Sequence, residues 1–447
     1  MKCGEIALYI TLGFILIVPM FAGGDDLSGE QISIAREFVD LLVEEKFEQA
    51  AEYFDGNMRA GLPIEKLSQL WNSLYNQMGG FKSQLGVRTA IISEYDVVFI
   101  TCEFDNGTLD IKVVLNSAGQ VAGLFFLPPE NQAEYTAPEY VDDAKFVEQD
   151  ITIGEDKWRL DGKLTIPKQS EKFPVVILVH GSGPQDMDET LGPNKPFRDI
   201  AHGLASKGIA TLRYNKRTYQ YGSKMTEIKG QITVYEETIQ DVLNAVQILS
   251  KDSRITDIFI LGHSLGGMLI PRIATHKPKV TGYIIMAGNT RPLEDMIIEQ
   301  MRYIYLLDGE LSEQEKQQLR ILDRQVSLVK SDTLTEDVPA DSLPLGVPAK
   351  YWLDLRNYKP AETAKSINEP IMIAQGGRDY QVTSEDFNIW KSALSGKDNV
   401  EFKYYPQLNH LFFTGEGMAT PEEYQQPGNV NSKFIQDISR WIKENSK

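Results

Sequence analysis

The chain contains almost no cysteine. Only Cys3 and Cys102 occur among its 447 residues, which excludes the small folds that depend on disulfide frameworks. Cys3 comes before the N-terminal apolar run, whereas a lipoprotein cysteine would follow such a run. Cys102 lies in the strand-like segment VVFITCEF, at residues 97–104, which favours a buried structural thiol over a nucleophile. The fold must therefore be stable without cross-links.

Basic residues are outnumbered by acidic ones. The chain has 45 Lys and Arg against 63 Asp and Glu, a net charge of −18, which argues against nucleic acid as a partner. The acidic group Asp186, Asp188 and Glu189 has no histidine at ligand spacing nearby, so a solvated acidic loop is favoured over a metal site. The glycine pattern of a dinucleotide-binding loop is missing at Gly181 and Gly183. We expect neither a metal nor an organic cofactor.

Long apolar runs are missing beyond the N-terminus. Residues 6–18 are apolar, Pro19 interrupts them, and small residues follow at 22–24. This run falls short of the ~20 residues that span a bilayer, and its flanks are typical of a secretory signal peptide over residues 1–24. The interpretation is an exported protein, periplasmic or extracellular. An uncleaved membrane anchor is the alternative.

Residues 25–130 predict a small α+β domain. Apolar positions at helical spacing cover 28–55, where Ser28 and Gln31 form a possible capping box, and a second helix is expected at 63–78. Four strand-like runs follow, at 83–92, 97–104, 109–116 and 121–129. No catalytic group of residues occurs in this domain. Residues 131–143 are rich in proline and acid and are interpreted as a linker.

Residues 144–447 predict an α/β domain. A strand pair at 146–154 and 158–167 precedes a series of continuous apolar runs separated by helical patterns, which is typical of a mostly parallel sheet buried on both faces. These runs cover 173–181, 208–215, 257–262, 281–288, 370–377 and 400–406. About eighty residues separate the fourth run from the fifth, too many for a simple crossover. Helical patterns there, with a capping box at Ser312 and Glu315, predict a helical cap inserted at about 290–362.

Ser264 is the candidate nucleophile. It lies in GHSLGG, between the apolar run DIFIL and the helical pattern MLIPRIATH. This strand–turn–helix context is that of a nucleophile elbow, in which flanking glycines allow a tight turn that exposes the serine hydroxyl. A glycine-rich turn without chemistry is the alternative.

A serine hydroxyl needs a base, and the chain has five histidines. His410 follows the last apolar run, at the strand end where parallel sheets place function. His263 adjoins the serine too closely to act as its base, and His202 and His276 lie in helical segments that favour structural roles. His180 ends a strand in the HGSG loop.

Asp379 is the candidate orienting acid. It lies in a glycine-rich loop after a buried run, and the order Ser264, Asp379, His410 matches the order found in α/β-hydrolases. A capping aspartate for the helix that begins near Ser384 is the alternative. Asp354, in the cap, and Asp386, interpreted as helical and solvated, are rival acids.

Backbone N–H groups are expected to form an oxyanion hole. Leu265 follows the nucleophile directly, and Ser182 or its neighbour Gly183 offers the second donor from the HGSGP loop. Basic residues at 213–217, Arg213, Lys216 and Arg217, are interpreted as a solvated rim rather than as a site for a substrate carboxylate.

From about residue 144 to its end the chain resembles an α/β-hydrolase. The segments HGSGPQDMDE, RYNKR, GHSLGGM, GGRDYQV and LNHLF are similar to those of a bacterial branch that includes esterases, thioesterases and proteins known as serine aminopeptidases. Members often have Asp and Gly where this chain has Asn215 and Thr218. The first domain resembles a small module of unknown function, cystatin-like or related to nuclear-transport-factor folds.

The residues and the resemblance together predict a serine hydrolase. Ser264 would attack an acyl carbonyl, His410 would transfer the proton, and Asp379 would orient the imidazole. The resemblance implies carboxylic esters of small to medium acyl groups as substrates. A serine exopeptidase, a thioesterase and an inert binding protein of the cell envelope are the alternatives. A small-molecule ester is the one partner predicted, and no oligomeric state is.

Overall fold

The computed structural model describes residues 29–92, 95–127, 135–154, 156–222, 225 and 231–446. Contacts divide the described residues into two compact units, residues 29–127 and residues 135–446. The predicted signal peptide and Ser28 of the first capping box lie outside the described residues. None of the described helices is both long enough and apolar enough to cross a membrane.

The N-terminal unit is an α+β domain, as predicted. Its four helices are α1 (Gly29–Val43), α2 (Phe47–Glu52), α3 (Gly56–Gly61) and α4 (Ile64–Met78). Its antiparallel sheet has the order β1 (Phe81–Ile92), β2 (Tyr95–Phe104), β3 (Gly107–Leu115) and β4 (Val121–Leu127). The expectation of one helical stretch over 28–55 was wrong, because Glu45 adopts a left-handed φ of 55° that ends α1 and separates it from α2.

Cys102 lies in the core of this unit. Its thiol is fully buried between the helices and the sheet, among side chains that include Phe38 and Trp71. Burial, reinforced by the Asp110 carboxylate, raises the pKa of the thiol to about 12. The prediction of a buried structural thiol is confirmed.

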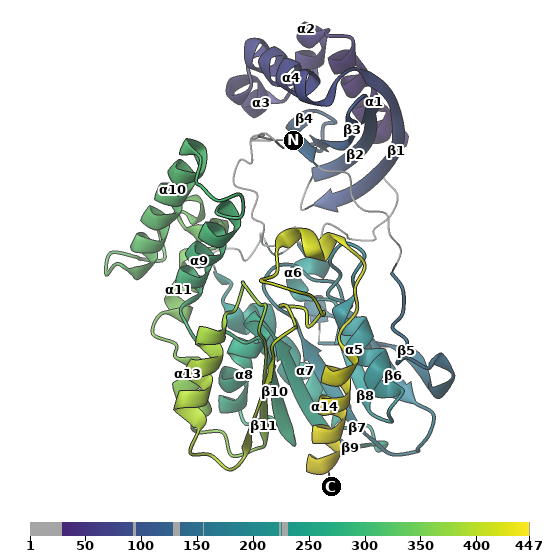
Figure 1. Ribbon diagram of the computed structural model, residues 1–447, viewed down its shortest axis with the longest axis vertical. Coiled ribbons are helices and arrows are strands. Elements are labelled where there is room, and N and C mark those ends of the chain that lie inside the picture. The colour runs from purple at the N-terminus through teal and green to yellow at the C-terminus, as the bar shows by residue number, and fades with distance from the viewer. Residues whose placement is uncertain are drawn as a thin grey trace. The chain divides into compact units, whose positions relative to one another are not determined.

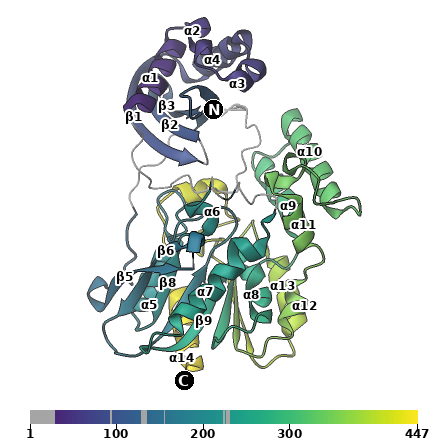
Figure 2. The same ribbon diagram turned by 180° about the vertical axis from the view of Figure 1, so that it is seen from behind.

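The second unit is built on an eight-stranded sheet (Figures 1 and 2). The order across the sheet is β12-β11-β10-β9-β7-β8-β6-β5. The pairs β5/β6 and β6/β8 are antiparallel, and the remaining neighbours are parallel. The strand bounds are β5 (Phe146–Ile153), β6 (Leu160–Pro167), β7 (Phe173–Val179), β8 (Ala210–Tyr214), β9 (Ile255–His263), β10 (Gly282–Met286), β11 (Ile371–Gly376) and β12 (Val400–Tyr405). Every strand-like run of the sequence thus forms a strand.

Helices cover both faces of this sheet (Figures 1 and 2). One face packs against α7 (Gln240–Leu249), α8 (Leu265–Thr275), α12 (Pro360–Ala364) and α13 (Ser384–Leu394). The other packs against α5 (Pro196–Ala205) and α14 (Ser432–Asn445). The strands bury apolar side chains on both faces, which explains why their sequences read as continuous rather than alternating apolar runs.

A helical insertion lies between β10 and β11. It contains α9 (Leu293–Tyr305), α10 (Glu313–Lys330) and α11 (Ala349–Leu355), and Figure 1 shows the three helices grouped together. Its own apolar core includes Ile297, Val326 and Trp352. Ser312 and Glu315 form the predicted capping box at the start of α10. The sequence did not predict the helix α11, because its seven residues are too few to show a helical apolar period.

Part of the predicted linker packs on the α/β domain. The Tyr135 hydroxyl donates a hydrogen bond to Asp199 Oδ1 at 2.8 Å, and the Tyr140 hydroxyl donates one to the carbonyl of Val430 at 2.7 Å. These two tyrosines attach residues 135–140 to the domain that follows. The linker interpretation rested on the many proline and acidic residues and did not take the tyrosines into account.

Candidate active site

Ser264 occupies a strained turn between β9 and α8. Its backbone has φ 52° and ψ −117°, outside the regions that a non-glycine residue usually adopts. The Ser264 N–H donates to the carbonyl of Met286, 2.9 Å away on the neighbouring strand β10. Strain of this kind persists only where surrounding contacts fix it, and it is typical of functional sites.

Glycines make this turn sterically possible. A Cβ atom on Gly262 would lie 2.3 Å from the carbonyl oxygen of Gly266, and one on Gly266 would lie 2.4 Å from that of Val179. A Cβ on Gly181, in the loop after β7, would lie 3.2 Å from the Cβ of Ser264. The glycines therefore allow the elbow and the loop after β7 to approach each other closely.

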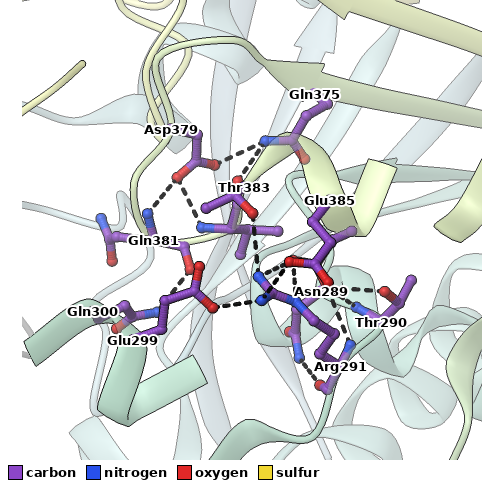
Figure 3. Close-up of polar contacts among 12 residues, drawn as sticks. Asn289, Thr290, Arg291, Glu299, Gln300, Gln375, Asp379, Gln381, Thr383 and Glu385 are labelled. Carbon is purple, nitrogen blue, oxygen red and sulfur yellow. Dashed lines mark hydrogen bonds and ion pairs between the residues drawn. The ribbon is translucent and has the colours of Figure 1, made fainter. Parts of the chain in front are cut away.

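His410 and Asp379 are brought together from the loops after β12 and β11. The Nδ1 atom of His410 lies 2.7 Å from Oδ2 of Asp379, and both side chains are buried. Asp379 also accepts hydrogen bonds from the Gln375 side chain at 3.1 Å and from the N–H group of Gln381 at 2.8 Å (Figure 3). The N–H group of Val382 donates to the same carboxylate at 2.9 Å. The other partners are all donors, so the carboxylate is held to accept a hydrogen bond from Nδ1–H of His410, which leaves Nε2 free for chemistry.

Two backbone N–H groups beside Ser264 are unpaired within the described residues. They belong to Leu265, the first residue of α8, and to Ser182. The N–H of Gly181 is already bonded to Glu189 Oε1 at 2.9 Å, which leaves Ser182 or its neighbour Gly183 as the donor in the loop after β7. The N-terminus of α8 adds the positive end of a helix dipole.

Ser264 and His410 line one pocket of about 320 Å³. The loops after β7, β9, β10, β11 and β12 form its floor, and the cap helices α9 and α11 supply much of its wall. Its size suits a small ligand. The apolar lining residues are Pro184, Leu191, Leu265, Leu293, Met296, Ile297, Leu345, Val347, Trp352, Val382 and Leu411.

His263 is held in place beneath the site. Its Nδ1 lies 2.9 Å from Glu189 Oε2, and its Nε2 lies 3.0 Å from the carbonyl oxygen of His410. Burial opposes the charged imidazolium, but the Glu189 carboxylate outweighs that effect and raises the pKa of His263. Burial likewise opposes the Glu189 charge, and His263 overcomes it and lowers the pKa of Glu189. The two form a buried ion pair that supports the backbone of His410.

The remaining histidines have structural contacts. His202 lies 3.1 Å from Glu148 Oε1, and the His276 ring packs on Tyr235. His180 is buried with its Nε2 3.0 Å from the carbonyl of Asp186. Burial, partly opposed by Glu189, lowers the pKa of His180 to about 4, so this imidazole is neutral at physiological pH.

The rival acids form ion pairs elsewhere. Asp354 binds Arg272, with Oδ2 2.9 Å from Nη1. Asp386 was expected to be solvated, and this was wrong: it is fully buried and binds Arg291 through Nε and Nη2, at 3.1 and 2.8 Å. A helical pattern cannot show that an arginine from the start of the cap, 95 residues away in sequence, covers this carboxylate.

The expectation of a solvated basic rim was also wrong. Arg213, Lys216 and Arg217 are each no more than 2% exposed. Arg213 forms ion pairs with Asp188 and Glu148, and Arg217 binds Asp241. Such pairing offsets the cost of burying each charge. None of the three lines the pocket, so none is placed to meet a substrate carboxylate.

The acidic loop is not solvated either. Asp188 and Glu189 are 9% and 4% exposed, and both are paired with basic groups. In the part of the chain that the structure describes, no cluster of His, Cys, Asp or Glu is arranged to hold a metal ion. The sequence analysis did not identify Glu189, Gln375 and Lys216 as supporting residues. Glu189 lies shortly after HGSG and Gln375 directly before GGRD, whereas Lys216 is close to neither segment in the sequence.

Comparisons with known proteins agree with this architecture. A domain of unknown function, DUF3887, matches residues 35–124, and the family described as serine aminopeptidase, S33, matches residues 171–416. Esterase EstD of Thermotoga maritima is 42% identical over 405 residues, which cover 91% of this chain and 93% of that protein. That match is longer than the α/β domain alone.

The chain also has weaker similarities to two other proteins. Monoacylglycerol lipase of Mycolicibacterium smegmatis is 20% identical over 272 residues, 60% of this chain and 87% of that protein. The solved structure of Est1E from Butyrivibrio proteoclasticus is 17% identical and covers 66% of this chain and 98% of its own, with a TM-score of 0.42. The S33 match spans just over half of the chain, and the similarity to Esterase EstD spans nearly all of it. The chain therefore belongs to the S33 family of α/β-hydrolases and carries an N-terminal DUF3887 domain.

Proposed function

We propose that the protein is a serine hydrolase that cleaves carboxylic esters of small to medium acyl groups. The observation that carries the proposal is the meeting of three features in one pocket: the strained elbow at Ser264, the His410–Asp379 hydrogen bond of 2.7 Å, and the free N–H groups beside them. The similarity to Esterase EstD supports an ester as the substrate.

The proposed reaction proceeds through an acyl-enzyme. Ser264 Oγ attacks the ester carbonyl while His410 Nε2 takes its proton, and Asp379 stabilises the imidazolium that forms. The N–H groups of Leu265 and Ser182 bind the oxyanion. His410 then protonates the leaving alkoxide. Water, activated by the same imidazole, attacks the acyl-enzyme and releases the carboxylic acid.

The lining of the pocket favours uncharged substrates. No lysine or arginine is among the described residues that line it, so a phosphate or carboxylate on the substrate would meet no counter-charge. The wall near the cap is mostly apolar, which suits an acyl or alkyl chain. This argues against acyl-coenzyme A thioesters, whose phosphates would need a basic site.

The pocket also bears on the exopeptidase alternative. An aminopeptidase must bind the α-ammonium group of its substrate, and the carboxylates that line the described pocket are Glu189 and Glu237. Glu189 is paired with His263, and Glu237 with Lys216 and the Tyr351 hydroxyl, at 2.9, 2.8 and 2.7 Å. Both carboxylates are therefore satisfied within the protein, which favours an ester over an aminoacyl amide.

A substrate panel tests this proposal. Initial rates on para-nitrophenyl esters of increasing acyl length are compared with rates on aminoacyl para-nitroanilides and on acyl thioesters, for the full chain and for Ser264→Ala. The expected result is Ser264-dependent hydrolysis that is fastest on uncharged esters of short to medium chain length. Faster cleavage of aminoacyl anilides than of esters would contradict it.

We further propose that the protein acts after export, in the periplasm or outside the cell. Support comes from the N-terminal sequence alone, which has the length and flanking residues of a signal peptide. The intact mass of the protein recovered from its native cells tests this: loss of about the first 24 residues is expected, and a full-length chain in the cytosolic fraction would contradict export.

A further inference from the structure

Lys216 is a buried cation next to the proposed oxyanion hole. Its Nζ donates to the carbonyl oxygen of Gly181 at 2.8 Å and forms an ion pair with Glu237 Oε1, also at 2.8 Å. Its own backbone N–H donates to the carbonyl of Gln185 at 2.9 Å. One residue of the loop after β8 therefore holds both ends of residues 181–185, the loop that carries Ser182.

The contact with Gly181 acts on the peptide unit that contains the proposed donor. The Gly181 carbonyl and the Ser182 N–H belong to one peptide, which is planar and trans, so the two groups point in opposite directions. An ammonium bonded to the carbonyl thus fixes the plane and directs the Ser182 N–H away from Lys216. A charge-assisted bond to the oxygen also polarises the peptide and makes its N–H a stronger donor.

The backbone conformation of Gly181 depends on these contacts more than that of another residue would. Glycine adopts many backbone conformations, and a side chain here would crowd Ser264, as its Cβ would lie 3.2 Å from that of the serine. Two buried charges hold it instead: Glu189 accepts from its N–H at 2.9 Å and Lys216 donates to its carbonyl. The peptide planes on both sides of Gly181 are thereby fixed.

Charge compensation alone does not account for this arrangement. Lys216 neutralises the buried Glu237 carboxylate, but that role needs no contact with Gly181. Lys216 does not line the pocket and so does not touch the substrate. Its effect on the reaction would pass through the Gly181–Ser182 peptide.

We propose that Lys216 is a positioning residue that orients and polarises the Gly181–Ser182 peptide so that the Ser182 N–H binds the oxyanion. The inference rests on the proposed serine hydrolase function. The Ser182 N–H would bind the substrate oxygen in the transition state, where this oxygen becomes negative, and not in the bound ester. Loss of Lys216 should therefore lower kcat and leave KM nearly unchanged.

The test compares wild type with Lys216→Met, which keeps the length of the side chain and removes the ammonium. Because Glu237 would then be a buried charge without its cation, the double variant Lys216→Met/Glu237→Gln restores neutrality if the single variant does not fold. Lys195→Met is the matched control, since Lys195 pairs with Asp188 on the same loop and has no bond to Gly181. Kinetics use a para-nitrophenyl ester, a trifluoromethyl ketone as oxyanion analogue, and fluorophosphonate titration of active sites.

The expected kcat per titrated site falls about 10- to 100-fold, less than the 10²–10³-fold typical of complete loss of an oxyanion donor. KM should change by less than about threefold, and the affinity for the trifluoromethyl ketone should fall by the same factor as kcat/KM. Lys195→Met should behave as wild type.

Two results would overturn the inference while the proposed function stands. One is an unchanged kcat and ketone affinity in a folded variant whose parent depends on Ser264. The other is a loss of rate explained entirely by fewer titratable sites, which would make Lys216 a structural residue only. Absence of Ser264-dependent hydrolysis in wild type would overturn both proposals.

Discussion

His410 and Asp379 share a hydrogen bond of 2.7 Å, although they come from loops on different strands. The bond is buried, and Gln375 with two backbone N–H groups fixes the other lone pairs of the carboxylate. The orientation of the imidazole is thus set before any substrate binds. Preorganisation of this kind is what a general base requires.

Asp379→Asn tests the role of this carboxylate. The amide keeps the shape of the side chain but favours the wrong tautomer of His410, so kcat on a para-nitrophenyl ester should fall by about 10⁴-fold. The folded state should persist, because the backbone N–H bonds can be made to the amide oxygen. Steady-state kinetics with circular dichroism on the same sample measures both. An activity within about tenfold of wild type would exclude Asp379 as the orienting acid.

Asp386→Asn should show the opposite behaviour. Asp386 binds Arg291 and the N–H groups of Thr290 and Arg291 at the start of the cap, and it does not line the pocket. Weakening this buried pair should lower the free energy of unfolding by about 1–3 kcal/mol. Urea unfolding and kinetics at low denaturant separate the two effects. A catalytic loss as large as that of Asp379→Asn would mean that the assignment of the acid is mistaken.

Gly266→Ala tests the geometry of the elbow. The new methyl group would lie 2.4 Å from the backbone oxygen of Val179, and a backbone atom cannot rotate away. We expect a loss of at least about 2 kcal/mol in unfolding free energy, together with loss of ester hydrolysis. Gly61→Ala is the control, since nothing lies within 4 Å of its Cβ position. Equal stability of the two variants would refute the steric explanation.

The sequence predicted the strands, and of the residues that it singled out, Ser264 and His410 line one pocket and His410 contacts Asp379. Buried parallel strands such as β7 and β9 need continuous apolar runs, and an elbow needs glycines at fixed offsets from its serine, so both leave local patterns. Ion pairs between residues far apart in sequence leave no such local pattern. Arg217 and Asp241 form a buried pair 24 residues apart in sequence, and a charged side chain reads as solvated unless its partner is known.

The sequence also predicts the cap incompletely. Its long helices α9 and α10 have clear periodicity, whereas α11 is too short to show one. Yet α11 supplies Tyr351 and Trp352 to the pocket. The residues expected to select the acyl group are therefore those that the sequence predicts least well.

His180 should make the protein less stable in acid. Its folded pKa is about 4, because burial disfavours the charged ring, while an unfolded histidine titrates near about 6.5. Because the pKa of His180 is lower in the folded state, its contribution to the free energy of unfolding is fully present above the unfolded pKa. This contribution, up to about 3 kcal/mol, is lost as the pH falls toward the folded pKa. Urea unfolding from about pH 7 to pH 5 should give a smaller loss for His180→Gln than for wild type. Identical pH slopes would contradict the buried neutral imidazole.

In the proposed reaction Ser264 is an activated nucleophile. The most direct measurement is the intact mass of the protein after treatment with a fluorophosphonate, for wild type and Ser264→Ala, with the ester rate of each. We expect a single adduct on wild type, none on the variant, and a rate about 10⁶-fold lower without the serine. A folded wild type that takes up no adduct, or a variant that is labelled and active to the same extent, would contradict it.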